Sequence, residues 1–239
     1  MSYQKWDEGF LYVLFEREGY DFSEHHGWFL KSFESLKKYV PNARVCLYTN
    51  KHIEERDLLD EYIYDENHRA INASVADGLL RSPFKKTIYM DNDIVVERAL
   101  ISGVFDFLGE YSFAGVYANW WGEGTLRPDF HGGLMGVNTG SEVTRELIRE
   151  WIQIQDKDLH WSNQKAMRKL MIRHRKEFCI LPSWLVFRVN HIFSLVNDAI
   201  VTHDHKMDKL EVVKKMIASL EDGLLGVEKE MEHERNRKE

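Results

Sequence analysis

Three residues in mid-chain, Asp91-Asn92-Asp93, follow the short apolar run at 87–90 and bring two carboxylates together. If the extended strand continues through them, Asp91 and Asp93 share one face, with their Cα atoms about 6–7 Å apart. Two carboxylates at that spacing repel each other unless a cation lies between them. Hard oxygen ligands suit Mg²⁺ or Mn²⁺, and a site with few protein ligands leaves positions open for substrate phosphates. The triplet alone is equally compatible with a solvated turn after a strand.

Strands and helices alternate on both sides of this triplet. The apolar run at 10–15 lacks alternation, which is typical of a strand covered on both faces. Apolar residues recur at helical spacing over 26–39, with Ser23 as a candidate N-cap. We expect further strands at 45–48, 62–64, 87–90, 113–117, 134–137, 178–181 and 199–202, and further helices at 53–59, 70–80, 102–108, 142–154 and 162–174. This order predicts a layered α/β domain with a mostly parallel sheet, in which ligands bind beyond the carboxyl ends of the strands.

Composition excludes several classes of protein. The 239 residues are 44% hydrophobic and 30% charged, which is typical of a globular chain. The 39 acidic residues outnumber the 32 basic ones, giving a net charge of −7, and no basic cluster predicts nucleic-acid binding. The longest apolar runs fall far short of the roughly 20 residues of a membrane helix. The N-terminus has no apolar core followed by a cleavage site, so we expect a cytoplasmic protein. Cys46 and Cys179 each lie in an apolar segment, which predicts core thiols rather than a disulfide or zinc framework.

Five segments, in a fixed order along the chain, resemble those of one enzyme family. SPFKKTIYMDNDIVV at 82–96 resembles the DxD segment of GT-A nucleotide-sugar glycosyltransferases, especially the group that includes glycogenin and the lipopolysaccharide galactosyltransferases. FHGGLM at 130–135 resembles that group's Phe-Asn-Ser-Gly-Val segment, and WSNQKA at 161–166 resembles its Asp-Gln helix start. Residues 181–190 resemble its Leu-Pro-x-x-Tyr-Asn segment, and IVTH at 200–203 resembles the strand that ends in a metal-binding histidine. The shared order is more specific than any single segment.

The resemblance implies a GT-A domain over 1–206. The Lys/Glu-rich, partly amphipathic pattern that follows predicts a C-terminal helical extension with a mobile end over 207–239. The resemblance also implies a hexosyltransferase that moves a sugar from a nucleotide-diphosphate-sugar, a UDP-sugar in the first instance, to a hydroxyl group of a glycan, protein or small molecule. Transfer would retain the anomeric configuration. Asp91, Asp93 and His203 would hold Mn²⁺ or Mg²⁺ on the donor's phosphates. Such a cation stabilises the charge that develops on the leaving diphosphate.

Further roles follow from the same resemblance. Asn163 and Gln164 stand where the family has Asp-Gln, and an amide can still donate to and accept from sugar hydroxyls. The donor nucleotide is expected to contact Phe15, Glu16, Tyr20, Asp91, Asn92 and Lys206. The acceptor is expected to contact Trp120, Trp121, His131 and Gly132. The tryptophan pair lies in a glycine-rich connection, where aromatic faces could form a mobile platform for a sugar or plug the edge of the sheet.

The chain also departs from the family pattern. Asn163 replaces the aspartate of the Asp-Gln pair, and His131 stands where the group has asparagine. The family's basic residue on the helix before the DxD strand has no clear match, although Arg69 or Arg81 could replace it. Two alternatives stay open. One is a haloacid dehalogenase-type phosphatase with Asp91 as nucleophile, although that family places its motif near the N-terminus. The other is a nucleotide- or glycan-binding protein without turnover.

Overall fold

The computed structural model describes most of the chain up to the end of the last strand. The described residues are 4–16, 19, 21–66, 74–122, 125–157, 163–181, 186–188 and 201–203. At 117–122, 125–129, 163, 186–188 and 201–203 the backbone alone is described. The predictions made for Tyr20, Arg69, Lys206 and the extension at 207–239 therefore lie outside the described residues.

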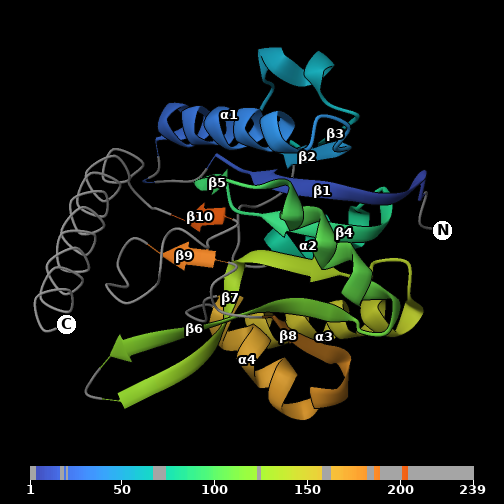
Figure 1. Cartoon of the computed structure of the whole chain (residues 1–239), viewed down its shortest axis with the longest axis vertical. Helices are drawn as coiled ribbons and strands as arrows, with labels where there is room; N and C mark the ends of the chain where they lie inside the picture. The colour runs from blue at the N-terminus through green and yellow to red at the C-terminus, as the bar shows by residue number, and fades with distance from the viewer. Residues whose placement is uncertain are drawn as a thin grey trace, which may run out of the picture.

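A seven-stranded sheet forms the centre of the molecule, in the order β3-β2-β1-β4-β7-β6-β8 (Figure 1). Its strands are β1 (Trp6–Leu14), β2 (Val45–Thr49), β3 (Glu61–Tyr64), β4 (Phe84–Met90), β6 (Phe113–Gly122), β7 (Thr125–Val137) and β8 (Phe178–Leu181). Strands β3, β2, β1 and β4 run parallel to one another, as do β6 and β8, whereas β7 is antiparallel to both of its neighbours. The prediction of an α/β domain with a mostly parallel sheet is confirmed.

A second, three-stranded sheet lies at the carboxyl end of β4. It has the order β5-β10-β9 and consists of β5 (Ile94–Val96), β9 (Val186–Arg188) and β10 (Val201–His203). Strand β10 is antiparallel to β5 and parallel to β9. The small sheet therefore joins the segment directly after the acidic triplet to residues about one hundred positions later in the chain.

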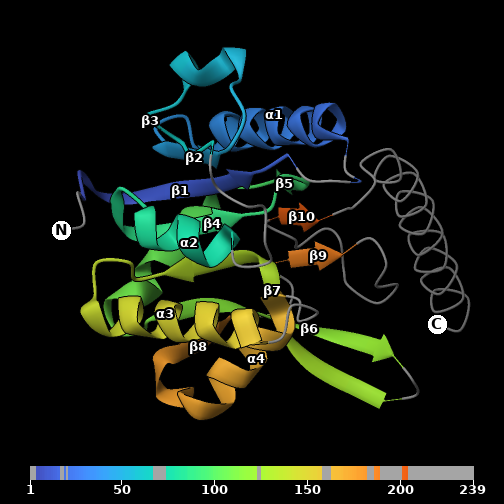
Figure 2. The ribbon, with the colours of Figure 1, turned by 180° about the vertical axis from the view of Figure 1, so that it is seen from behind.

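Helical elements cover both faces of the large sheet. They are α1 (Phe22–Tyr39), α2 (Ser74–Arg81), α3 (Glu142–Lys157) and α4 (Asn163–Arg173), together with the 3₁₀ segments η1 (Glu54–Leu58), η2 (Ala99–Gly109) and η3 (Arg175–Glu177). Side chains of α1 and η2 pack on one face of the sheet, and those of α2, α3 and α4 pack on the other. Figure 1 shows η2 in front of the sheet, and Figure 2 shows α2 and α3 in front when the molecule is turned around.

Strand β1 contributes to both of these cores. Phe10 and Tyr12 belong to the core under α1, whereas Leu11 and Val13 belong to the core under α2 and α3. Successive side chains of a strand point to opposite faces, so a central strand needs an unbroken apolar run. This requirement explains why the segment at 10–15 shows no alternation of polar and apolar residues.

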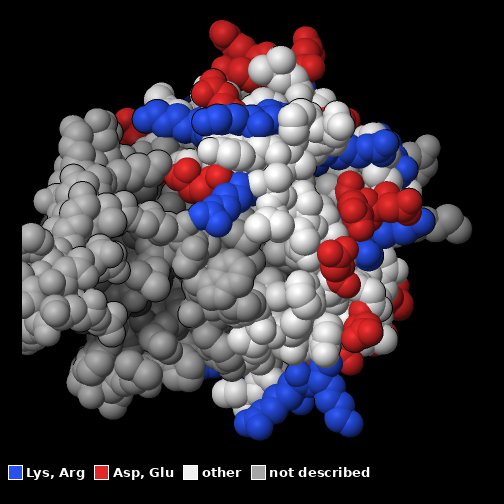
Figure 3. All heavy atoms as spheres, in the orientation of Figure 1, with Lys and Arg blue, Asp and Glu red and all other residues white. Residues whose placement is uncertain are grey.

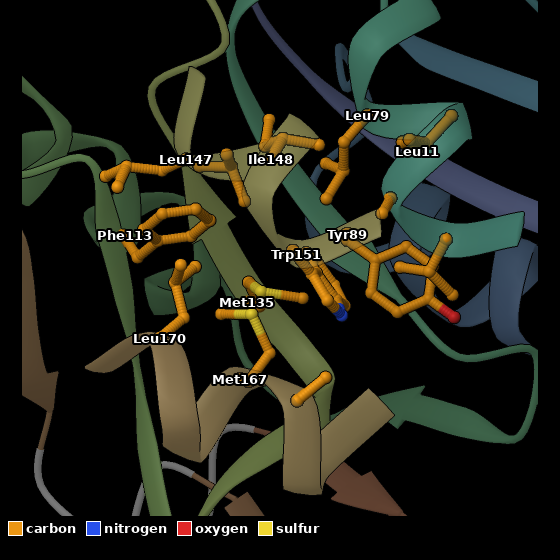
Figure 4. Close-up of a cluster of buried hydrophobic side chains, with 14 of the residues drawn as sticks. Leu11, Leu79, Tyr89, Phe113, Met135, Leu147, Ile148, Trp151, Met167 and Leu170 are labelled. Atoms are coloured by element: carbon orange, nitrogen blue, oxygen red, sulfur yellow. The ribbon is translucent and has the colours of Figure 1, made fainter. Parts of the chain in front are cut away.

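The core on the second face centres on Trp151 of α3. Figure 4 shows its indole between Met135 of β7 and Tyr89 of β4, with Met167 and Leu170 of α4 completing the same cluster. Burial of large side chains of this kind is the main source of folding free energy. Tyr89 therefore belongs to a packed core although it lies two residues before Asp91.

Charged side chains on the face shown in Figure 3 are arranged in two ways. Lysine and arginine atoms form a row over α1, whereas opposite charges alternate near the start of β1. There Lys85 Nζ lies 2.7 Å from Asp7 Oδ1, and Lys86 Nζ lies 3.3 Å from Glu8 Oε1. These exposed pairs join the beginnings of β1 and β4, and the Lys85 hydrogen bond and charge lower the pKa of Asp7.

Several predicted boundaries differ from the structure. Asp21, rather than Ser23, caps α1, because its carboxylate accepts from the amides of Ser23 at 2.9 Å and Glu24 at 3.4 Å. A carboxylate is favourable at a helix N-terminus, where amides point outward. The helices predicted at 53–59 and 102–108 form the 3₁₀ segments η1 and η2. Neither Cys46 nor Cys179 forms a disulfide, and burial raises the pKa of the Cys46 thiol.

The largest correction concerns the segment around the tryptophan pair. Trp120 and Trp121 lie within β6, where their backbones pair with Arg127 and Leu126 of β7, so the predicted glycine-rich connection at this position is wrong. Aromatic residues favour extended backbone, and that preference prevails over the flanking glycines. Figures 1 and 2 show the two strands projecting from the sheet as a ribbon.

None of the described helices combines the length and the apolar character required to cross a membrane.

Two glycines give a matched test of packing in this fold. A Cβ at Gly115 of β6 would lie 2.3 Å from the buried Phe130 ring, whereas a Cβ at Gly27 of α1 would meet nothing within 4 Å. We expect Gly115→Ala to lower the free energy of unfolding by about 1–3 kcal/mol, because the ring has no space to move. Gly27→Ala should raise it by about 0.5–1 kcal/mol, because alanine favours the helix. Urea denaturation measures both, and an unchanged midpoint for Gly115→Ala would contradict this packing.

Candidate functional site

The acidic triplet forms a turn at the carboxyl end of β4. Strand β4 ends at Met90, and the amide of Ile94 donates to the carbonyl of Asp91 at 3.2 Å, which closes the turn before β5 begins. The strand does not continue through Asp91 and Asp93, so the alternation of side chains along a strand does not apply to them. The prediction that the two carboxylates share a strand face is therefore wrong. Asp93 is buried, with 6% of its surface exposed, and Asp91 is half-buried.

Asp91 is held through both its side chain and its backbone. The hydroxyl of Tyr89 donates to Asp91 Oδ1 at 2.5 Å, and the amide of Asp91 donates to the carbonyl of Gly133 in β7 at 2.7 Å. Hydrogen bonds to charged groups contribute more than those between neutral groups. Because the Tyr89 ring is fixed in the core around Trp151, the orientation of this carboxylate depends on the packing of α3. Tyr89 was not predicted from the sequence, although its position two residues before Asp91 was a usable signal.

Asn92 links the turn to the neighbouring strand. Its Nδ2 donates to the carbonyl of Val13 at 3.1 Å, at the end of β1. Its Oδ1 is buried and has no hydrogen-bond partner among the described residues. A buried acceptor without a donor costs free energy, so this oxygen is suited to receive a donor from a bound group. Asn92 thus favours a ligand at the turn.

The small sheet brings the distant histidine segment to the same place. In the register of β10 with β5, His203 is opposite Ile94, the residue that follows Asp93. Opposed residues of an antiparallel pair have Cα atoms about 4.5–5.5 Å apart. The backbone of His203 therefore lies beside the acidic turn. Among the side chains that the structure describes, no three His, Cys, Asp or Glu groups are close enough to hold a metal.

The ends of β1 and β2 form the adjoining part of the site. Phe15 is buried and packs edge-on against the Tyr48 ring, with the ring centres 4.9 Å apart. Glu16 is exposed and forms an ion pair with Lys51. The Asn50 side chain forms two hydrogen bonds with the Glu16 backbone. It accepts from the amide at 2.8 Å and donates to the carbonyl at 3.3 Å. Asn50 and Lys51, which directly follow β2, were not predicted from the sequence.

Helix α2 is fastened to β2 beside this region. The Tyr48 hydroxyl donates to Asp77 at 2.6 Å, and Arg81 lies 3.0 Å from Asp77 and 3.4 Å from Asp65. Burial, reinforced by the hydrogen bond to Asp77, raises the pKa of Tyr48. Arg81, one of the two candidates for the missing basic residue, thus already pairs with two carboxylates. This pairing makes it a tether for α2.

On the other side of the turn, β7 departs from its register with β6. Gly115 pairs with Met135, but the next pair is Tyr117 with Phe130, so residues 131–134 lie opposite Val116 alone. His131 begins this bulge and is buried, with 1% of its surface exposed. Its Nδ1 accepts from the amides of Gly133 and Leu134, at 3.2 Å each. Because the Gly133 carbonyl in this bulge accepts from the Asp91 amide, the bulge lies directly beside Asp91.

The remaining predicted residues lie in the elements next to this bulge. Asn163 begins α4, Gln164 is half-buried in its first turn, and α4 packs against β7. Gly132 lies in the bulge, and Trp120 and Trp121 lie in the projecting ribbon. The structure thus brings Asp91, Asn92, Asp93, His131, Gly132 and the His203 backbone together around the end of β4. The roles assigned to these residues stay predictions.

No protein-family model matches the sequence, and no curated protein matches it significantly. Solved structures do match. The galactosyltransferase LgtC, in complex with donor and acceptor sugar analogues, aligns with a TM-score of 0.56 at 12% identity, covering 83% of this chain and 87% of LgtC. The glycosyltransferase GlyE of Streptococcus pneumoniae TIGR4 aligns with a TM-score of 0.62 at 12% identity, covering 82% of this chain and 54% of GlyE. Mouse xyloside xylosyltransferase 1 aligns with a TM-score of 0.55 at 13% identity, covering 83% and 98%.

These matches extend over more than four-fifths of the chain and establish its fold. The chain spans just over half the length of GlyE. The fold predicted from the order of the five sequence segments is confirmed: this chain has the GT-A fold of glycosyltransferases.

Proposed function

We propose that the chain is a metal-dependent glycosyltransferase that moves a sugar from a nucleotide-diphosphate-sugar, in the first instance a UDP-sugar, to a hydroxyl acceptor with retention of configuration. The observation that carries this proposal is the acidic turn at 91–93, which ends the central strand of a GT-A fold beside the backbone of His203. Ligands of open α/β sheets bind at this edge.

The chemistry of the turn fits a divalent cation. Asp91 and Asp93 supply carboxylate oxygens, and His203 would supply an imidazole, a combination that suits Mn²⁺ and is compatible with Mg²⁺. The buried Asn92 Oδ1 could accept from a metal-bound water or from the donor ribose. When bound, the cation supplies charge stabilisation for the departing diphosphate.

The protein's own groups would orient the donor and acceptor around this cation. Tyr89 and Gly133 fix Asp91, and Val13 fixes Asn92. In this proposal the nucleotide extends toward the ends of β1 and β2, where Glu16 lies. The donor contacts proposed in this region are Phe15 and Glu16. The contacts proposed for Tyr20 and Lys206 lie outside the described residues.

The sugar would lie on the opposite side of the turn, toward α4 and β7. Asn163 and Gln164, at the start of α4, would bind its hydroxyls. The acceptor would approach from the side of the β7 bulge and the projecting ribbon, where Trp120, Trp121, His131 and Gly132 are located. Holding both substrates in this way lowers the entropic cost of bringing the reacting atoms together.

The two alternatives have different standing. A haloacid dehalogenase-type phosphatase carries its nucleophile on the first strand of its domain, whereas here the acidic turn follows β4 in a GT-A fold. The fold therefore favours glycosyl transfer. A binding protein without turnover shares the same fold, and the replacement of the family's aspartate by Asn163 favours keeping it as the second candidate.

A panel of UDP- and GDP-sugars tests the proposal. We expect Mn²⁺-dependent hydrolysis of at least one donor, and a loss of about 100-fold or more in Asp93→Asn, because the variant removes a charge that holds the cation. Asp106→Asn, an exposed change on η2, is the matched control and should retain full activity. Hydrolysis of a phosphate monoester with no nucleotide-sugar turnover would favour the phosphatase. Metal-dependent nucleotide binding without any turnover would favour the binding protein.

Tyr89→Phe tests whether the core orients the metal site. The variant keeps the buried ring but removes the donor to Asp91 Oδ1, so we expect Mn²⁺ affinity to fall by about tenfold, as for other groups that orient a ligand. Electron paramagnetic resonance of free Mn²⁺ measures the affinity directly. Tyr39→Phe at the end of α1 is the control and should bind Mn²⁺ as the wild type does. Equal affinities for Tyr89→Phe and the wild type would show that this bond has no role in metal binding.

A further inference from the structure

We infer that His131 is a positioning residue, which acts through Nδ1 on the β7 bulge and thereby places the backbone that holds Asp91. This inference rests on the proposed function, since the site it serves is the proposed metal site. It assigns His131 a role different from the acceptor contact suggested by its place in the sequence. The evidence is the pair of backbone bonds to its ring, its burial and its place in the bulge.

The ring of His131 is turned onto its own strand. Nδ1 accepts from the amides of Gly133 and Leu134, and only 1% of the residue surface is exposed. A ring nitrogen that accepts carries a lone pair, so this hydrogen-bond network assigns the proton of a neutral imidazole to Nε2. The atom that satisfies the bulge is therefore committed to the backbone and is not available to a sugar hydroxyl.

These two amides meet that acceptor where the pairing with β6 is interrupted. Residues 131–134 lie opposite a single residue of β6, so the ordinary ladder with β6 does not continue through them, whereas Leu134 keeps its pairing with Met90 of β4. A β-bulge interrupts the ladder locally, and buried amides that lose their partner destabilise the structure. His131 supplies an acceptor to two successive amides of the bulge with one atom.

The same peptide segment reaches Asp91. The amide of Gly133 is bound by His131, and the carbonyl of Gly133 accepts from the Asp91 amide at 2.7 Å. Leu134, the second residue bound by His131, is the register partner of Met90, the last residue of β4. The two hydrogen bonds of His131 therefore act on the two residues of β7 that adjoin the end of β4, and any shift of the bulge would move Asp91.

The same geometry predicts which side chains could replace His131. The Oδ1 of asparagine and the Nδ1 of histidine are both bonded to Cγ, so either can present an acceptor at the same distance from the backbone. Glutamine places its acceptor one bond further away, and leucine has none. Asparagine would thus preserve the acceptor while changing the rest of the side chain.

A series of variants at this position tests the inference. We expect His131→Leu and His131→Gln to weaken Mn²⁺ and UDP-sugar binding by about tenfold or more, as for residues that orient a metal ligand. His131→Asn should restore binding to within about threefold of the wild type. The acceptor KM should change little across the series. His25→Leu on α1 is the matched control. The inference would be overturned if His131→Leu and His131→Gln bound Mn²⁺ and the UDP-sugar as tightly as the wild type. It would also be overturned if the variants changed only the acceptor KM.

A second measurement needs neither a variant nor activity. Nitrogen-15 NMR of the imidazole in the wild-type chain should show an unprotonated Nδ1 and a protonated Nε2 at neutral pH. A protonated Nδ1 would overturn the inference even if every variant lost activity through misfolding. Failure of the proposed function would give a different result, because the wild type itself would then bind neither Mn²⁺ nor a UDP-sugar. The tautomer of His131 would still show whether its Nδ1 accepts from the bulge.

Discussion

The hydrogen bond from the Asp91 amide to the Gly133 carbonyl joins the two halves of the molecule at the site. On one side lie the parallel strands β3, β2, β1 and β4, and on the other lie β7, β6 and β8. The two sides meet where β4 pairs antiparallel with β7. The acidic turn occupies this junction and is tied to both halves, through Val13 of β1 and Gly133 of β7. A turn fixed by two buried strands is preorganised, so little reorganisation is needed when charge develops on a ligand.

The turn also connects the two cores of the domain. Tyr89, just before it, is packed around Trp151 under α3, whereas Ile94, just after it, belongs to the core under α1. Its geometry therefore depends on packing on both faces of the sheet. Close-packed interiors transmit small changes in volume to their neighbours, so stability and the geometry of the site are not independent in this protein. We therefore expect substitutions under α3 to act on Asp91 through Tyr89.

Several strands, the layered architecture and the position of the acidic turn were predicted from the sequence, whereas the α1 cap, the 3₁₀ segments and the strand register were not. The unbroken apolar run of β1 and the position of the acidic turn follow from residues adjacent in the chain. The bulge at His131 does not, because it depends on the register of two strands, and nothing in the sequence around Gly132 specifies which amides lose their partners. The placement of Trp120 failed because aromatic residues between glycines are compatible with a loop or a strand, and only the pairing with β7 decides. The approach of His203 to Ile94 was implied only by the family resemblance.

One departure from the glycosyltransferase pattern bears on the proposed sugar site. Asn163 begins α4, which packs against β7, whereas both carboxylates of the acidic turn are present. Every nucleotide-diphosphate-sugar presents the same two phosphates to a cation, so a change of sugar requires no change in the cation's ligands. Groups that bind sugar hydroxyls must instead match the stereochemistry of each sugar, because an unpaired polar group in a buried site discriminates strongly between substrates. In the proposed function, Asn163 is therefore the departure that would bear on the sugar, whereas Asp91 and Asp93 would serve the diphosphate.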